Sequence, residues 1–186
     1  GRAVAARSTL PVLGNVLLAT DVSGLRLSAT NLELGITCWI GAKVHEEGST
    51  TVPAKTFIDL VGTLPRDRVD LELTMRTQTL QVTSAQFNND IKCIDAQEFP
   101  ILPSADKAQA IELNVRDLRA MIDQVVFAAA TDDARPVLTG VEVKIEGGEI
   151  SFAAADGFRL ALCNAALSAT DVEPISAIIP ARGLAE

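Results

Sequence analysis

The sequence of 186 residues contains no tyrosine, one tryptophan and one histidine, His45. Stacking platforms for single-stranded nucleic acid need several aromatic side chains, so binding of that kind is not expected. One histidine and three scattered cysteines do not easily supply a zinc site or a Ser-His-Asp triad. No apolar run approaches the roughly eighteen residues that a membrane span needs, and the start does not resemble a signal peptide. These absences exclude a membrane-spanning protein and argue against secretion of the chain as given.

The chain is acidic, with 16 Lys and Arg residues against 24 Asp and Glu residues and a formal net charge of −8. Proteins that bind nucleic acid by bulk electrostatic attraction usually carry the opposite sign. Contact with DNA would therefore use a local basic surface on an acidic body, and it would be loose. With 48% hydrophobic and 22% charged residues, the chain can bury a core in one large domain or two of ordinary size.

The three cysteines, Cys38, Cys93 and Cys163, are widely separated, and each lies in an apolar or alternating stretch. An odd number without a close pair predicts reduced, buried thiols in a cytoplasmic protein. The pattern does not favour a disulfide or a metal site, and no cofactor is expected.

The most informative feature is an internal repeat. Three segments recur in the same order, the first two at an offset of 125 residues and the third at 127: 10–16 with 135–141, 28–31 with 153–156, and 52–55 with 179–182. A period near 125 residues is too long for a solenoid unit and suits a small domain. The sequence therefore predicts two copies of one domain.

The two copies are incomplete in complementary ways. The second copy begins with a helical pattern from Asn114 to about Ala130, where the first copy has only residues 1–8. The first copy continues through residues 56–103, whereas the second stops at Glu186. We expect domain one at residues 1–104, lacking most of its first helix, and a truncated domain two at residues 105–186.

Strand patterns of period two fill most of each copy. The alternation covers residues 69–75, 80–82 and 87–93 in the first copy, and residues 141–145 and 150–154 around Gly147-Gly148 in the second. These segments are predicted to be half-buried antiparallel strands joined by tight turns. With two helices per unit on one side of the strands, the expected fold class is α+β. Residues 95–108, with Pro100 and Pro103, form the predicted connection between the copies.

Each predicted helix has an apolar and a polar face. In the helix after Asn114, the predicted N-cap, the apolar stripe consists of Val115, Leu118, Ile122, Val125 and Ala129. The opposite face carries Arg116, Arg119, Ala120 and Asp123. In the helix from about Ala54 to Leu64, the residues predicted to face the core are Phe57, Leu60, Val61 and Leu64, and those facing away are Lys55, Asp59 and Gly62.

Four motifs, in register along the whole chain, resemble one known family. Residues 7–15 read RSTLPVLGN, which is similar to the R-x-T-L-P-I-L-G-N segment in domain one of bacterial sliding clamps, the beta subunits of DNA polymerase III. Residues 156–160 read DGFRL and follow RPVLTG at 135–140, which resembles the TDGHRL region of domain two. The motifs VPAK at 52–55 and EFP at 98–100 also fall where that family has similar motifs.

The resemblance implies a specific architecture and role. Clamps of this family have three similar domains per chain and close head to tail as a homodimer, which gives a six-domain ring around duplex DNA. Helices line the hole and sheets form the outer shell. The clamp performs no chemistry but tethers the replicative polymerase, the clamp loader and repair proteins to DNA, which raises their effective concentration there. The expected location is the bacterial cytoplasm, in association with the nucleoid.

The resemblance also implies a basic lining. The candidate DNA-binding residues are those of the polar helix faces, the turn after the second helix and an arginine of the first motif: Arg7, Lys55, Arg66, Arg68, Arg116, Arg119 and Arg182. A weak hold on phosphates carries no sequence information and permits sliding. Each residue could equally be an ordinary solvated cation, and pairing of Arg119 with Asp123 at i, i+4 would partly neutralise the lining.

A second site follows from the same family, whose partners dock short Gln-x-x-Leu-Phe-like motifs in an apolar pocket between domains two and three. This chain's share of the wall would be Ala155, Gly157, Phe158, Arg159 and Leu160. Ala155 replaces the family's threonine and Phe158 its histidine, so the rim is more apolar and the fine specificity is open. Without the resemblance, Gly157 would mark an ordinary tight connection between strands.

The alternative classes of function are an enzyme and a peptide-binding scaffold. For an enzyme, the acidic candidates are Asp132, Asp133 and Asp156, and no glycine-rich phosphate loop, HExxH or GxSxG motif occurs. Catalysis is therefore not expected. The alternative is a non-catalytic, tandem-domain scaffold that binds peptides but does not encircle DNA. A gathering of the basic helix faces on one concave surface would favour the clamp, and their scattering would favour the scaffold.

Overall fold

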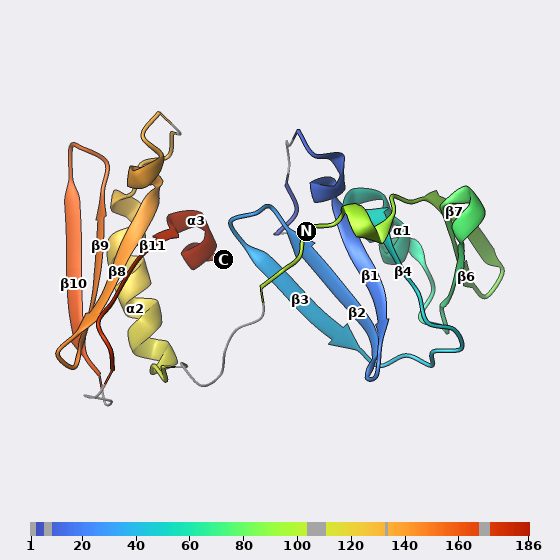
Figure 1. Cartoon of the computed structure of the whole chain (residues 1–186), viewed down its shortest axis with the longest axis horizontal. Helices are drawn as coiled ribbons and strands as arrows, with labels where there is room; N and C mark the ends of the chain where they lie inside the picture. The colour runs from blue at the N-terminus through green and yellow to red at the C-terminus, as the bar shows by residue number, and fades with distance from the viewer. Residues whose placement is uncertain (1–2, 6–8, 104–110, 133, 168–171) are drawn as a thin grey trace. The chain divides into compact units, whose positions relative to one another are not determined.

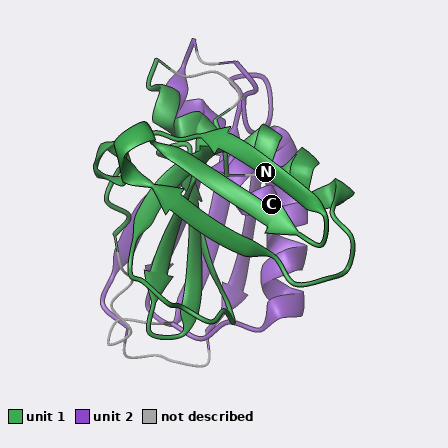
Figure 2. Cartoon of the chain, turned by 90° about the vertical axis from the view of Figure 1, so that its right-hand side faces the viewer, with its two compact units in different colours: residues 1–103 green, residues 104–186 purple. Residues whose placement is uncertain are grey.

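The computed structural model describes residues 3–5, 9–103, 111–132, 134–167 and 172–186. The chain divides into two compact units, Gly1–Pro103 and Ser104–Glu186, which Figure 2 shows in separate colours. The predicted boundary between residues 104 and 105 lies outside the described residues.

Unit 1 contains two antiparallel sheets. The four-stranded sheet has the order β3-β2-β1-β4, with β1 at Asn15–Asp21, β2 at Gly24–Thr30, β3 at Gly35–Ile40 and β4 at Ser49–Pro53. The three-stranded sheet has the order β5-β6-β7, with β5 at Asp70–Thr74, β6 at Thr79–Ser84 and β7 at Phe87–Lys92. The helix α1, Ala54–Thr63, follows β4 directly (Figure 1). The described part of unit 1 also has short 3₁₀ turns at Pro11–Gly14, Met75–Thr77 and Ala96–Glu98.

The core of unit 1 lies where α1 meets both sheets. The buried side chains Leu18, Val52, Leu80, Val82 and Ile91 form one cluster, and Phe57, Leu60 and Leu64 of α1 pack against it. Val61 was predicted to face the core, and this prediction was wrong, because Val61 is 47% exposed. Val61 lies on a flank of α1 that no described element covers. Met75 was also expected to continue a strand, but the chain turns there into a 3₁₀ segment that ends at Gln78 with a positive φ of 46°.

The described residues of unit 2 form a four-stranded antiparallel sheet with helices on one face. The sheet order is β10-β9-β8-β11, with β8 at Gly140–Glu146, β9 at Glu149–Ala155, β10 at Leu160–Ala166 and β11 at Ile175–Pro180. The helices are α2, Val115–Val125, and α3, Ala181–Ala185, with 3₁₀ segments at Val126–Ala128 and Pro136–Thr139. The helix α2 packs on β9 and β10, and α3 packs on β8 and β11 (Figure 1).

Both helices of unit 2 cover the same face of the sheet. Inward-facing residues at alternate positions of β8 and β9, such as Val143 and Phe152, share one buried cluster with Met121 and Val125 of α2 and Ala181 of α3. Register supports this arrangement, since Val143 lies directly opposite Phe152. The alternation that predicted these strands is thus explained by one face packing on helices and the other meeting water.

The helix α2 begins as predicted, since the Asn114 side chain accepts a hydrogen bond from the N–H of Arg116 at 2.9 Å. Leu118, Ile122 and Val125 pack toward the core. Val115 does not, because it is 77% exposed in the first turn of the helix. Met121, which the predicted stripe omitted, is buried in the cluster instead.

The predicted repeat is confirmed by the order of the elements. In sequence order, β1, β2, β3, β4 and α1 of unit 1 correspond to β8, β9, β10, β11 and α3 of unit 2, and the two sheets have equivalent strand orders. The first three strands of each set begin at an offset of 125 residues, and the helices at an offset of 127. The β8–β9 turn uses Gly147 and Gly148 with φ of 61° and 79°, as a tight hairpin requires. The fold is therefore α+β, with a repeated unit.

The cysteine prediction was wrong for Cys38, which is exposed, whereas Cys93 and Cys163 are half-buried. None of the helices in the described ranges is long and apolar enough to cross a membrane. In the same part of the chain, no three His, Cys, Asp or Glu side chains are grouped as a metal site would require.

Candidate DNA-binding helices and peptide-binding wall

The helix layer of unit 2 carries three of the predicted DNA-binding cations. Arg116 and Arg119 are exposed on α2, and Arg182 is exposed on α3, which covers the same face of the sheet. The predicted i, i+4 pair is present, with Arg119 Nε 3.9 Å from Asp123 Oδ2. Because both side chains are more than 70% exposed, this ion pair is weak and leaves Arg119 accessible to a phosphate.

The predicted DNA-binding cations of unit 1 differ in whether they form an ion pair. Lys55 is exposed at the second position of α1, the position that Arg182 occupies in α3. Arg66 is also exposed. Arg68 forms an ion pair with Asp70 that is also exposed, and its Nε and Nη2 donate to Asp70 Oδ1 at 2.8 and 2.6 Å. Arg7 lies outside the described residues.

The five residues predicted for the peptide-binding wall lie at the connection between β9 and β10. Ala155 ends β9 and lies directly opposite Leu160, which begins β10. Leu160 is 71% exposed because it points away from the sheet face that α2 covers. Phe158 is 95% exposed. The connection therefore presents two large apolar side chains, Phe158 and Leu160, to solvent.

Asp156 organises this connection. Its Oδ1 accepts hydrogen bonds from the N–H groups of Phe158, at 2.9 Å, and Arg159, at 3.0 Å. Its Oδ2 accepts from Nε of Arg159 at 2.9 Å. The bond from the Phe158 N–H, followed by those from Arg159, lowers the pKa of the Asp156 carboxyl from its ordinary value, against an opposing effect of burial.

The backbone conformation at residue 157 favours glycine. Its φ of +92° is one that side-chain-bearing residues rarely adopt. A Cβ added there would lie 2.7 Å from Nη1 of Arg135, so the guanidinium packs over the glycine. Nη2 of Arg135 also donates to the Asp156 carbonyl at 2.9 Å.

Arg159 is held on two sides. Besides its bond to Asp156, its guanidinium carbon lies 5.7 Å from the centre of the Phe127 ring, a cation–π distance. Arg135, Asp156 and Phe127 therefore contact the predicted residues of this connection. The sequence motifs include Arg135 and Asp156, but sequence reasoning assigned Arg135 no role and considered Asp156 only as an acidic candidate for catalysis; no signal placed Phe127 near Arg159.

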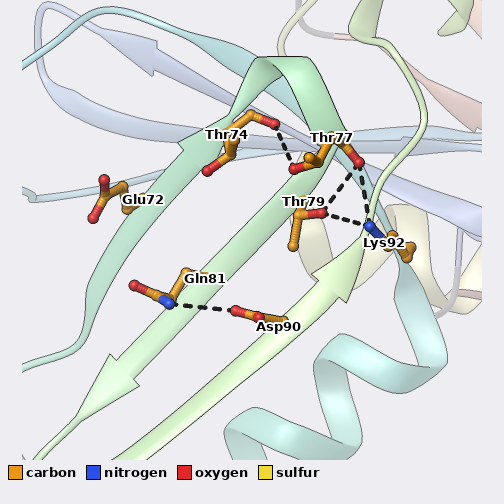
Figure 3. Close-up of a pocket in the computed structure, with 7 residues that line it drawn as sticks. All are labelled: Glu72, Thr74, Thr77, Thr79, Gln81, Asp90 and Lys92. Atoms are coloured by element: carbon orange, nitrogen blue, oxygen red, sulfur yellow. Dashed lines mark hydrogen bonds between the residues drawn. The ribbon is translucent and has the colours of Figure 1, made fainter.

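A separate hollow of about 360 Å³ lies on the polar face of the three-stranded sheet of unit 1. Its lining residues are Glu72, Thr74, Thr77, Thr79, Gln81, Asp90 and Lys92 (Figure 3). Nζ of Lys92 donates to Oγ1 of Thr79 at 2.9 Å, and Nε2 of Gln81 donates to Oδ1 of Asp90 at 3.4 Å. None of the predicted site residues lines this hollow.

Both units match models of one family. The model for the N-terminal domain of the DNA polymerase III beta subunit matches residues 1–103, and the model for its central domain matches residues 112–186. The beta sliding clamp of Synechocystis sp. (strain ATCC 27184 / PCC 6803 / Kazusa) is 36% identical over 203 residues, covering 100% of this chain and 52% of the relative. The beta sliding clamp of Synechococcus elongatus is 40% identical over 189 residues, covering 98% of this chain and 49% of the relative. The chain spans about half the length of these curated relatives.

Solved structures agree. A DNA polymerase sliding clamp from Bacillus subtilis superposes with a TM-score of 0.88 at 29% identity, covering 99% of this chain and 50% of that one. The DNA polymerase III subunit beta from Pseudomonas aeruginosa gives a TM-score of 0.85 at 30% identity, covering 96% and 49%. The repeated unit therefore has the fold of a DNA-clamp domain. The chain belongs to the family of DNA polymerase III beta subunits.

Proposed function

We propose that this chain is part of a sliding clamp that encircles duplex DNA and gives the replicative polymerase its processivity. The observation that carries the proposal is the repeated sheet unit whose helices present exposed cations, in a chain that belongs to the beta-subunit family. The proposed assembly is a head-to-tail homodimer of three-domain chains. Domain one would occupy residues 1–104 and domain two residues 105–186.

The electrostatics suit a topological hold on DNA. A ring cannot dissociate sideways from a closed duplex, so it needs neither tight binding nor contacts with bases. A body with a net charge of −8 is repelled by phosphates at close range, whereas local cations allow a weak, mobile contact. We assign that contact to Arg7, Lys55, Arg66, Arg116, Arg119 and Arg182. Arg68 would contribute less, because it already pairs with Asp70.

The second part of the proposal is a tether for partner proteins. The wall formed by Ala155, Gly157, Phe158, Arg159 and Leu160 would bind the apolar side chains of short Gln-x-x-Leu-Phe-like motifs in the polymerase, the clamp loader and repair proteins. The exposure of Phe158 and Leu160 supports an apolar ligand. Tethering raises the local concentration of a partner without any chemical step, so we propose no catalytic role and no cofactor. The proposed location is the bacterial cytoplasm, at the nucleoid.

The experiment is a primer-extension assay with the intact protein, its clamp loader and its polymerase on a singly primed circular template. A clamp is expected to lengthen the product made in one binding event. A protein that binds the polymerase's motif yet leaves product length unchanged would be a peptide-binding scaffold, and the clamp function would be wrong.

A further inference from the structure

The connection between β9 and β10 is tied to a distant part of the chain. Arg135, which precedes the 3₁₀ segment at Pro136–Thr139, donates from Nη2 to the carbonyl of Asp156 at 2.9 Å. The same guanidinium lies over Gly157, where a Cβ would meet Nη1 at 2.7 Å. Two segments that are 21 residues apart are therefore joined at the centre of the proposed peptide-binding wall.

Asp156 holds the connection from within. Its carboxylate accepts hydrogen bonds from the N–H groups of Phe158 and Arg159, two and three positions further on, and from Nε of Arg159. Charge-assisted bonds of this kind are stronger than neutral ones. Arg159 is further held over Phe127. With Arg159 held at the connection, the neighbouring Phe158 is 95% exposed.

We infer that Arg135 and Asp156 are positioning residues of the peptide-binding wall. They hold residues 156–159 in one conformation before a partner arrives, so that the Phe158 ring is already presented to solvent. Ordering a loop during binding weakens affinity, and a wall that is ordered in advance avoids that loss. Neither residue needs to touch the bound peptide. The inference rests on the proposed peptide-binding function of this wall.

The test uses the intact protein and a fluorescein-labelled synthetic peptide that ends in Gln-Ser-Ala-Leu-Phe, with binding followed by fluorescence anisotropy. Asp156→Ala removes all three acceptor contacts, and we expect about tenfold weaker binding. Asp156→Asn keeps an oxygen that can accept the two backbone N–H groups, so it should restore affinity to within about threefold of wild type. Arg135→Met should weaken binding about fivefold, and Arg135→Lys less, because lysine can still donate to the Asp156 carbonyl.

A second measurement does not involve the peptide. Amide hydrogen exchange at Phe158 and Arg159, read by NMR in the free protein, should be faster in Asp156→Ala than in wild type and near wild type in Asp156→Asn. The unfolding temperature of each variant is measured alongside. If Asp156→Ala or Arg135→Met does not fold, the inference is tested with the conservative variant at the same position, Asp156→Asn or Arg135→Lys, by its hydrogen exchange and its peptide affinity.

The outcomes separate the inference from the proposed function. Loss in Asp156→Ala with rescue in Asp156→Asn supports positioning. Equal loss in both variants would mean that the hydrogen bonds to the two backbone N–H groups do not position the wall, and wild-type affinity in both would mean that the connection needs no support; either result overturns the inference. A wild-type protein that does not bind the peptide contradicts the proposed function of the wall, and with it the role of Arg135 and Asp156.

Discussion

Cys38 and Cys163 occupy equivalent positions 125 residues apart, yet only Cys163 is covered by a helix. Cys38 lies on β3 opposite Leu27 of β2, and Cys163 lies on β10 opposite Phe152 of β9. In unit 2, α2 packs on β10, and Sγ of Cys163 lies 3.8 Å from the carbonyl of Met121. No described helix of unit 1 occupies that place, so Cys38 is exposed.

This difference predicts the order in which the thiols react in the 186-residue chain. Burial raises the pKa of the Cys163 thiol, which leaves less thiolate to react, and α2 restricts access to it. Ellman's reagent at pH 8 should therefore modify Cys38 at least about tenfold faster than Cys163. Cys38→Ser should remove the fast phase and Cys163→Ser should leave it. Equal rates for both thiols would show that the two faces are covered alike.

Two phenylalanines of unit 2 should separate folding from binding. Phe152 is buried in the core, so Phe152→Ala should lower the free energy of unfolding by about 3–5 kcal/mol. Phe158 is exposed, so Phe158→Ala should change the free energy of unfolding by less than about 0.5 kcal/mol. The same substitution should weaken peptide binding. Urea denaturation and fluorescence anisotropy measure the two effects. Normal peptide affinity in Phe158→Ala would remove Phe158 from the proposed wall.

Charge reversal should show whether DNA contacts the helix layer of unit 2 or the opposite face of its sheet. Arg116→Glu places a negative charge on α2, so we expect weaker association with a short linear duplex. The slope of the logarithm of the binding constant against the logarithm of salt concentration should fall by the equivalent of about one phosphate contact. The control is Lys144→Glu, because Lys144 is exposed on the sheet face away from the helices, 3.1 Å from Glu142. Both variants change the net charge by the same amount. Equal weakening by the two would mean that net charge, and not the helix layer, controls the contact.

A double-mutant cycle should measure the contact between Arg135 and Gly157. Gly157→Ala must hold an alanine at a positive φ and also displace the Arg135 guanidinium. In an Arg135→Ala background only the first penalty remains. We expect the loss of unfolding free energy from Gly157→Ala to be smaller in that background by about 0.5–1 kcal/mol. Losses that agree to within about 0.3 kcal/mol would show that the two residues are independent.

Asp156 should also make stability depend on pH. Its pKa is lowered in the folded chain, so its ionised carboxylate stabilises the fold fully above the unfolded value near 3.9. That contribution is lost as pH falls through the folded pKa. Arg159 is the cation that contacts this carboxylate, whereas Arg135 donates to the backbone carbonyl of Asp156. The unfolding temperatures of wild type and Asp156→Asn should therefore converge as the pH falls below about 4. A difference that does not change with pH would contradict this role.

Much of the fold followed from periodicity. Alternation predicted β6, β8 and β9, where one face packs on helices, and the N-cap at Asn114 located the start of α2. The predictions failed where a neighbour decides burial. Val61 and Cys38 have apolar patterns around them, but no described element covers them. Periodicity shows which face of an element is apolar and not what packs on it.

The candidate site was predictable only in part. The motif at residues 156–160 located the connection between β9 and β10, and the helix pattern located Arg116 and Arg119 on the exposed face of α2. The contacts of Arg135 with Gly157 and of Phe127 with Arg159 join segments that are far apart in the chain. Such tertiary contacts leave no local pattern in the sequence.

The most direct test of the proposed clamp is whether its hold on DNA is topological. The intact protein is loaded onto a closed circular plasmid, and half of the complexes are then cut once with a restriction enzyme. Our account predicts that the protein stays on uncut circles through gel filtration and slides off the linear molecules. Equal retention on circular and linear DNA would contradict it, because a protein held by contacts alone is indifferent to free ends.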